Sequence, residues 1–231
     1  MQKLNTRIRP RPPTRGLSAL RGSGYRRLKR AVDLILAGGL LLLFGPLMLA
    51  VAVAIKLYSP GPIFYRQQRL GKGGTPFTML KFRSMHVGSP SQIHRAHVER
   101  LIRENLRPED VGQGSLKLKR DPRVTKPGRM LRALSLDELP QIINVLRGEM
   151  SLVGPRPPLP YEYALYDDWH KQRLAVLPGI TGLWQVTGRN QVSFDDMVRI
   201  DLNYIETMSL WLDLYIILRT PFVMLVGKGG G

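Results

Sequence analysis

The longest apolar stretch of the chain runs from Leu34 to Ile55 and carries no charged side chain over its 22 residues. At about 1.5 Å per residue, a helix of that length spans a bilayer core of roughly 30 Å. Pro46 lies near its middle, and proline cannot donate a backbone hydrogen bond and crowds the preceding turn. The pattern therefore predicts a membrane segment over 25–58 that is broken at Pro46.

Two topologies fit this segment. Lys29 and Arg30 precede it and Lys56 follows it, so both flanks are basic, and positive charge favours the cytoplasmic side. A helix that enters and leaves on the same face satisfies both flanks. A kinked spanning helix is the alternative, since proline is tolerated in spanning helices. The residues alone leave both open.

The rest of the chain, 59–231, has the pattern of a folded cytoplasmic domain. Short apolar runs at 63–65 and 77–80 enclose a glycine-rich turn at 71–74, which predicts a small β-hairpin. Residues 84–120 are polar, and this composition predicts a surface excursion that contains one helix. Residues 178–190 are predicted to form a loop. Apolar periodicity predicts helices over 93–105, 136–146, 161–177 and 195–207. The fold class is therefore α+β and mainly helical.

The last segment, 208–226, is strongly apolar but contains Asp213 and Arg219, which disfavours a second crossing. An amphipathic interfacial helix with Trp211 and Tyr215 at headgroup level fits this composition. Packing of the same helix into the protein core is the alternative.

The charge of the chain is +18, and ten of its 35 basic residues fall within residues 1–30, where there is no acidic residue. We expect residues 1–24 to form a flexible basic arm that is attracted to anionic lipid. Nucleic acid is the less favoured partner, because Tyr25 is the single aromatic residue of this region. The chain has no cysteine, which excludes disulfides and thiolate chemistry.

The segment from Ser135 to Gln141 holds the sharpest candidate for chemistry, the adjacent carboxylates of Asp137 and Glu138. Ser135 and Glu138 have capping-box spacing, whereas Pro140 favours a later helix start, and the cap stays open. A helix N-terminus favours ionised carboxylates and can also receive a phosphate. One carboxylate could attack a phosphate while the other binds a cation. Alternatively, both carboxylates only interact favourably with the helix dipole.

A carboxylate attacks a phosphate only when cations offset the repulsion, and basic residues surround this pair in sequence. Arg132 precedes the pair. Arg156 follows it between Pro155 and Pro157, on a stiff backbone that suits a phosphate grip. A proline-rich connector is the alternative interpretation of that loop.

Ordered motifs along 25–226 resemble the bacterial sugar transferase family, the monotopic phosphoglycosyl transferases. The motifs that carry this resemblance are Lys29-Arg30-Ala31-Val32-Asp33, Lys81-Phe82-Arg83-Ser84-Met85, Asp121-Pro122-Arg123-Val124-Thr125, Gly128-Arg129, Leu134 to Gln141, Asn144-Val145-Leu146, Met150 to Pro157, Pro178 to Gly182, Gln185-Val186, Gly188-Arg189-Asn190, Asp201, Tyr204 and Leu212-Asp213.

The resemblance implies a transferase that moves a sugar-1-phosphate from a UDP-sugar to undecaprenyl (polyprenol) phosphate and releases UMP. It implies a re-entrant helix broken at Pro46, a site at the cytoplasmic face of the bacterial inner membrane, and Mg²⁺ as cofactor. Asp137 would be the nucleophile that forms a covalent phosphosugar intermediate, and Asp137 and Glu138 would be the metal ligands. The polymer it serves stays open among exopolysaccharide, O-antigen and other glycoconjugates.

The remaining roles follow from the same resemblance. Phosphate binding is expected from Arg132, Pro155, Arg156, Pro157, Lys81 and Arg83, and nucleotide-sugar contacts from Thr181, Gln185, Arg189 and Asn190. The sugar and the oligomeric state are not fixed, with a homodimer as one option. The rival function is a non-catalytic membrane adaptor.

Overall fold

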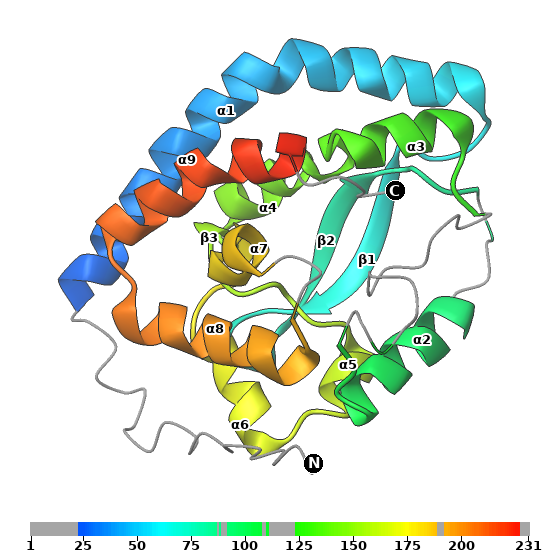
Figure 1. Ribbon diagram of the computed structural model, residues 1–231. Helices are drawn as coiled ribbons and strands as arrows, with labels where there is room; N and C mark the ends of the chain where they lie inside the picture. Colours follow the sequence, from blue (N-terminus) through cyan, green and yellow to red (C-terminus); the bar gives the residue numbers. More distant parts are fainter. Residues whose placement is uncertain are drawn as a thin grey trace.

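The computed structural model describes residues 23–86, 88, 92–107, 110, 123–188 and 192–226. Its first element, α1 (Ser23–Tyr58), is one 36-residue helix that contains Pro46. Figure 1 shows α1 changing direction along its length as it arches over the rest of the molecule. The predicted interruption at Pro46 therefore does not end the helix, which continues past the proline to Tyr58. Most of the predicted basic arm, residues 1–22, lies outside the described residues.

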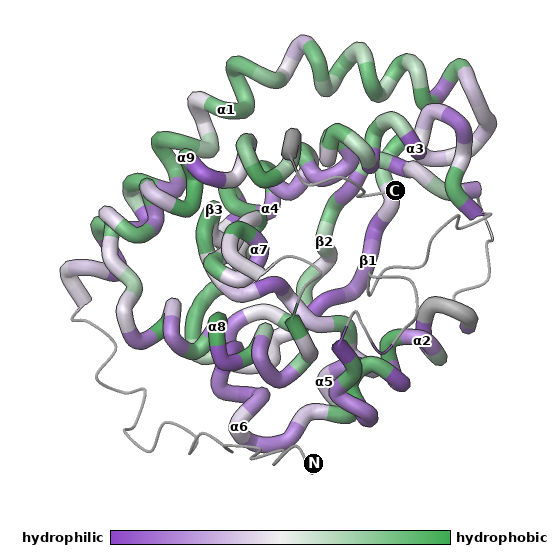
Figure 2. Tube along the Cα trace, in the orientation of Figure 1, coloured by the Kyte–Doolittle hydropathy of each residue, from purple (hydrophilic) through white to green (hydrophobic). Residues whose placement is uncertain are grey.

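Apolar side chains of α1 face outward. Leu42 is 83% exposed and Leu43 71% exposed, while Figure 2 shows apolar residues predominating along both α1 and α9 (Leu210–Val226). Among the described residues, α1 is the one helix long and apolar enough to cross a membrane. Its exposed apolar surface is what a lipid-facing helix requires.

The predicted hairpin is confirmed. Strands β1 (Phe64–Leu70) and β2 (Pro76–Phe82) pair antiparallel, with Phe64 opposite Phe82. The turn between them contains η2 (Lys72–Gly74), where Gly73 has a φ of 66° and Gly74 a φ of 80°. Glycine adopts these left-handed values without steric cost, which explains the glycine-rich turn.

A second sheet lies where the sequence analysis predicted no strand. Strands β3 (Ser151–Val153) and β4 (Gly179–Thr181) pair in parallel. The two segments approach so closely that a Cβ on Gly179 would lie 2.1 Å from the Gly154 nitrogen. Glycine is therefore required at position 179, where the first residue of β4 lies against the residue that precedes the Pro155–Pro158 loop.

Shorter helices make up most of the remaining fold, and two expected helices are divided. The expected helix over 161–177 is three short turns, and that over 136–146 is a 3₁₀ turn followed by a helix. The remaining elements are α2 (Gln92–Arg103), α3 (Lys126–Ala133), η3 (Leu136–Glu138), α4 (Gln141–Arg147), α5 (Pro160–Tyr163), α6 (Asp168–Lys171), η4 (Gln172–Ala175), α7 (Leu183–Thr187) and α8 (Phe194–Thr207).

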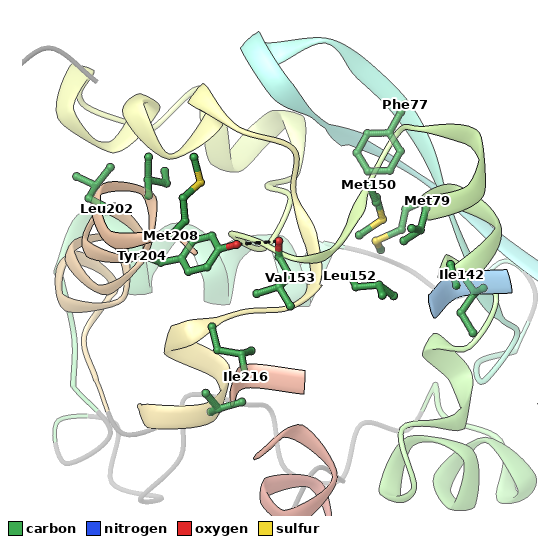
Figure 3. Packing of buried hydrophobic residues seen from close by; sticks show 14 of the residues in the cluster. Phe77, Met79, Ile142, Met150, Leu152, Val153, Leu202, Tyr204, Met208 and Ile216 are labelled. Atoms are coloured by element: carbon green, nitrogen blue, oxygen red, sulfur yellow. Dashed lines mark hydrogen bonds between the residues drawn. The ribbon is translucent and has the colours of Figure 1, made fainter. Parts of the chain in front are cut away.

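The main core gathers side chains from the hairpin, both short strands, α8 and α9 (Figure 3). Tyr204 on α8 is 1% exposed, and its hydroxyl lies 3.2 Å from the carbonyl oxygen of Val153. On α9, Ile216 is fully buried, whereas Trp211 is 79% exposed. The C-terminal helix α9 therefore has features of both expected arrangements. One face packs into the core, and the other presents apolar side chains outward, as an interfacial helix would.

The N-terminal half of α1 is bound to this domain by charged groups. Lys29 Nζ lies 2.7 Å from an Asp213 carboxylate oxygen on α9. Asp33 accepts hydrogen bonds from the Ser151 hydroxyl and the Leu152 N–H, at 2.8 and 3.1 Å. These contacts fix the start of α1 against β3 and α9.

The C-terminal end of α1 is bound to the same domain. Arg83, directly after β2, donates to the carbonyl oxygens of Ile55, Ser59 and Pro60 at 2.8 to 3.4 Å. These are among the carbonyls that a helix end and its following turn leave unsatisfied. Phe82 packs beside them on the last turns of α1. Both ends of α1 therefore attach to one folded unit.

Removing the Asp213 carboxylate should destabilise the protein. In Asp213→Ala, the mostly buried Lys29 loses its partner and the Tyr204 hydroxyl loses an acceptor 2.7 Å away. We expect a loss of about 2–4 kcal/mol in the free energy of unfolding. Asp168→Ala, which breaks the exposed Asp168–Lys171 pair, should cost under about 1 kcal/mol. Thermal unfolding in detergent measures both, and equal losses would contradict the anchoring role.

Candidate functional site

The two candidate carboxylates lie on η3, in the tight connection between α3 and α4. Ser135 before η3 is in the left-handed region with a φ of 54°, and its side chain makes no capping hydrogen bond. The capping box that the spacing suggested is therefore not formed. Pro140 instead precedes the first turn of α4. The strained turn at Ser135 presents Asp137 and Glu138 on a short, well-anchored segment.

Asp137 is nearly buried, with 7% of its surface exposed. Burial raises the pKa of its carboxyl group, and the negative charge of Glu138 adds to that effect. Lys81 and Arg132 act in the opposite direction because their positive charges favour the ionised form. The site thus contains a desolvated carboxylate whose ionisation depends on two neighbouring cations.

Lys81 is the second-to-last residue of β2 and reaches the carboxylate pair. Its Nζ lies 2.9 Å from Glu138 Oε1, with 16% of the Lys81 side chain exposed and 28% of that of Glu138. The alternating pleat of β2 directs Lys81 toward η3. Lys81 is therefore a counter-ion of the carboxylates in this structure.

A small open pocket is lined by Lys81 and Glu138, whereas Asp137 is not among its lining residues. It brings together the predicted residues Lys81, Glu138, Arg156, Pro157 and Gln185, which come from β2, η3, the proline loop and α7. Its other lining residues are Arg69, Met79, Gln141, Gly179 and Ile180. Residues separated by more than a hundred positions in sequence thus share one cavity that carries both signs of charge.

The proline loop is held from both sides. Gly179 N donates to Pro155 O at 2.9 Å, and Leu70 N donates to Pro158 O at 3.0 Å. Arg156 between them is exposed, whereas Pro155 and Pro157 are buried. The loop therefore fixes the backbone of Arg156 while its side chain stays accessible. Arg132, on α3, does not line this pocket, and its Nε donates to the Ser84 hydroxyl at 3.0 Å.

Two predicted residues, Arg83 and Thr181, do not line this pocket. Both Nη atoms of Arg83 donate to carbonyl oxygens in the turn that follows α1, and its expected phosphate role stays a prediction. The Thr181 hydroxyl pairs with the Thr220 hydroxyl of α9 at 2.8 Å. Gln185 lines the pocket through α7. Arg189 and Asn190 lie outside the described residues.

Two pocket residues, Arg69 and Gln141, were missed by the sequence analysis, and each is only 3% exposed. Arg69 belongs to β1, whose polar sequence gives no sign that one of its arginines is buried (Figure 2). Gln141 directly follows the predicted carboxylate segment, and only its adjacency to that motif could have pointed to it.

The carboxylate pair suits the Mg²⁺ that the sequence analysis expects. No cluster of three acidic, histidine or cysteine ligands occurs within the part of the chain that the structure describes. Mg²⁺ is commonly held by one or two carboxylates together with phosphate oxygens and water. Asp137 and Glu138 supply two carboxylates, and the negative charge of Glu138 raises the pKa of Asp137, an effect that a bound cation would oppose.

Comparison with known proteins places the chain among its relatives. A sequence profile described as bacterial sugar transferase matches residues 24–227. The chain belongs to the bacterial sugar transferase family. This family assignment agrees with the motifs in the sequence, and the match covers every element from α1 to α9.

Several curated proteins share this similarity. The exopolysaccharide production protein ExoY of Rhizobium meliloti is 41% identical, over 87% of this chain and 87% of that protein. The UDP-glucose:undecaprenyl-phosphate glucose-1-phosphate transferase of Caulobacter vibrioides is 45% identical, over 83% of this chain and 67% of that protein. The undecaprenyl-phosphate galactose phosphotransferase of Salmonella typhimurium is 40% identical, over 88% of this chain but 42% of that protein.

Proposed function

We propose that this protein transfers a sugar-1-phosphate from a UDP-sugar to undecaprenyl phosphate and releases UMP. The observation that carries the proposal is the buried carboxylate of Asp137, placed beside Glu138 and Lys81 on a domain whose helices expose apolar surface. The names of the Caulobacter and Salmonella relatives, which describe glucose and galactose phosphate transfer to the same lipid, support it. The ExoY relatives suggest a role in exopolysaccharide production.

The first step would be attack by an Asp137 carboxylate oxygen on the phosphorus that bears the sugar. The new O–P bond forms as the bond to the UMP oxygen breaks, so UMP leaves with the electron pair and a phosphosugar remains on Asp137. Lys81 and Arg132 favour the ionised carboxylate needed for attack. Arg156, on its rigid loop, would bind phosphate oxygens of the donor.

The second step would return Asp137 to its starting state. A phosphate oxygen of undecaprenyl phosphate attacks the same phosphorus, the bond to Asp137 breaks, and the lipid-linked diphosphate sugar is released. Both substrates would thereby use one carboxylate in turn. Mg²⁺ held by Glu138 and Asp137, when bound, would neutralise phosphate charge as a Lewis acid.

The membrane part of the proposal is that α1 enters and leaves on the cytoplasmic face of the inner membrane. Its support is that Lys29 and Asp33 near one end and Ile55 near the other are bound to the same domain. A domain cannot lie on both sides of a bilayer. The change of direction along α1 (Figure 1) and the outward apolar side chains of α1 and α9 fit a helix that dips into one leaflet.

Asp137→Asn should abolish UMP release from a UDP-sugar and undecaprenyl phosphate. The amide cannot act as the anionic nucleophile, so we expect a rate at least about a thousand-fold lower. Wild-type protein given the donor alone should release one UMP per site and gain the mass of a phosphosugar on Asp137. The matched control, Asp168→Asn on exposed α6, should keep the wild-type rate. Turnover by Asp137→Asn would refute the nucleophile, and an inactive wild type across a UDP-sugar panel would favour the adaptor.

The pH dependence should report the cation beside Asp137. Burial raises the pKa of this carboxyl group and Lys81 lowers it, so Lys81→Met should raise that pKa further. Because attack needs the ionised form, the acidic limb of the rate profile should move to higher pH in the variant. Lys171→Met, which alters an exposed lysine, should leave the limb in place. An unchanged limb in Lys81→Met would show that Asp137 does not control it.

A further inference from the structure

Arg69 is a buried cation in the wall of the candidate pocket, on a strand whose other charged residue, Arg66, is exposed. It is 3% exposed and lines the pocket together with Lys81, Glu138 and Arg156. Neither its charge nor its position is explained by the proposed attack of Asp137. Burying a guanidinium costs free energy that must be recovered through its contacts.

The hydrogen bonds of Arg69 use only some of the N–H donors of its guanidinium group. Nη1 donates to Pro157 O at 2.9 Å, and Nε and Nη2 donate to Gln67 Oε1 at 3.1 and 2.7 Å. A guanidinium has five N–H groups, so these bonds leave two for another acceptor. The bond to Pro157 also ties Arg69 to the loop that carries Arg156. The two arginines are therefore held in a fixed relation.

The charge of Arg69 is only weakly balanced. The Glu162 carboxylate lies 4.0 Å from Nη1, and the same oxygen accepts a hydrogen bond from Leu159 N at 2.8 Å. Burial, followed by the positive charge of Arg156, lowers the pKa of Arg69 to about 10. Arg69 thus stays protonated at neutral pH beside a like charge. An anion between the two arginines would relieve both the repulsion and the desolvation.

We propose that Arg69 and Arg156 together bind the diphosphate of a nucleoside diphosphate donor, Arg69 from the buried wall of the pocket and Arg156 from its exposed edge. The nature of this anion rests on the proposed function. The planar fork of arginine matches the oxygens of a phosphate, and two forks fit a diphosphate better than a single phosphate. Arg69 is then a substrate-binding residue that also positions the Arg156 loop through Pro157.

Binding of uridine, UMP and UDP to folded, detergent-solubilised protein tests this assignment without requiring turnover. In Arg69→Gln, we expect the affinity for UDP to fall about ten-fold or more, the affinity for UMP to fall less, and the affinity for uridine to be nearly unchanged. The matched control is Arg66→Gln, the same change three positions earlier on β1 at an exposed site. It should bind all three ligands as the wild type does. Isothermal titration calorimetry measures each affinity.

A loss in Arg69→Gln that is equal for all three ligands would overturn the proposal, since it would show a structural role alone. Undiminished UDP binding, or no UDP binding by the wild type, would overturn it as well. If Arg69→Gln does not fold, Arg69→Lys replaces it. This variant should bind UDP several-fold more weakly than the wild type and uridine with unchanged affinity. A wild-type affinity for UDP in Arg69→Lys would contradict the role of Arg69. A wild type that binds UDP in this graded way but turns over no UDP-sugar would refute the proposed function and leave this inference standing.

Discussion

The attachment of α1 to one domain at both of its ends is the constraint on which the remaining structure depends. Near the start of the helix, Lys29 meets Asp213 and Asp33 binds β3; at its other end Arg83 binds the last carbonyls. These contacts are charged and mostly buried, so their loss leaves unpaired groups. They determine which side of α1 faces outward, and hence where apolar surface lies relative to the pocket.

This arrangement connects α1 to the carboxylates of the candidate site. Lys81 lies on β2, and Arg83 directly follows that strand, two residues further along the chain. Arg83 holds the end of α1 and Lys81 holds Glu138. The hairpin therefore links the position of α1 to that of the carboxylates. A rigid link of this kind suits the proposed transfer, in which a water-soluble donor and a membrane-embedded acceptor have to meet.

Local patterns predicted the elements that local forces determine. The glycine-rich turn predicted the hairpin, and apolar periodicity predicted α8. The expected helix over 161–177 failed because Asp167 N donates to His170 Nδ1 and starts a new helix there. The sheet of β3 and β4 depends on a contact between Gly154 and Gly179 that no local pattern reveals. Of the candidate site, the motifs located Asp137, Glu138 and Arg156, whereas the burial of Arg69 and the helix-end role of Arg83 depend on tertiary packing.

Labelling of single cysteines tests the central claim most directly, because the chain contains no cysteine of its own. Ser23→Cys places a thiol at the exposed start of α1, and Thr75→Cys places one on the exposed hairpin turn. A membrane-impermeant maleimide is added to sealed vesicles of known orientation. The account predicts that both thiols react from the same side of the membrane. Reaction from opposite sides would contradict it, since the two ends of α1 could not then be bound to one domain.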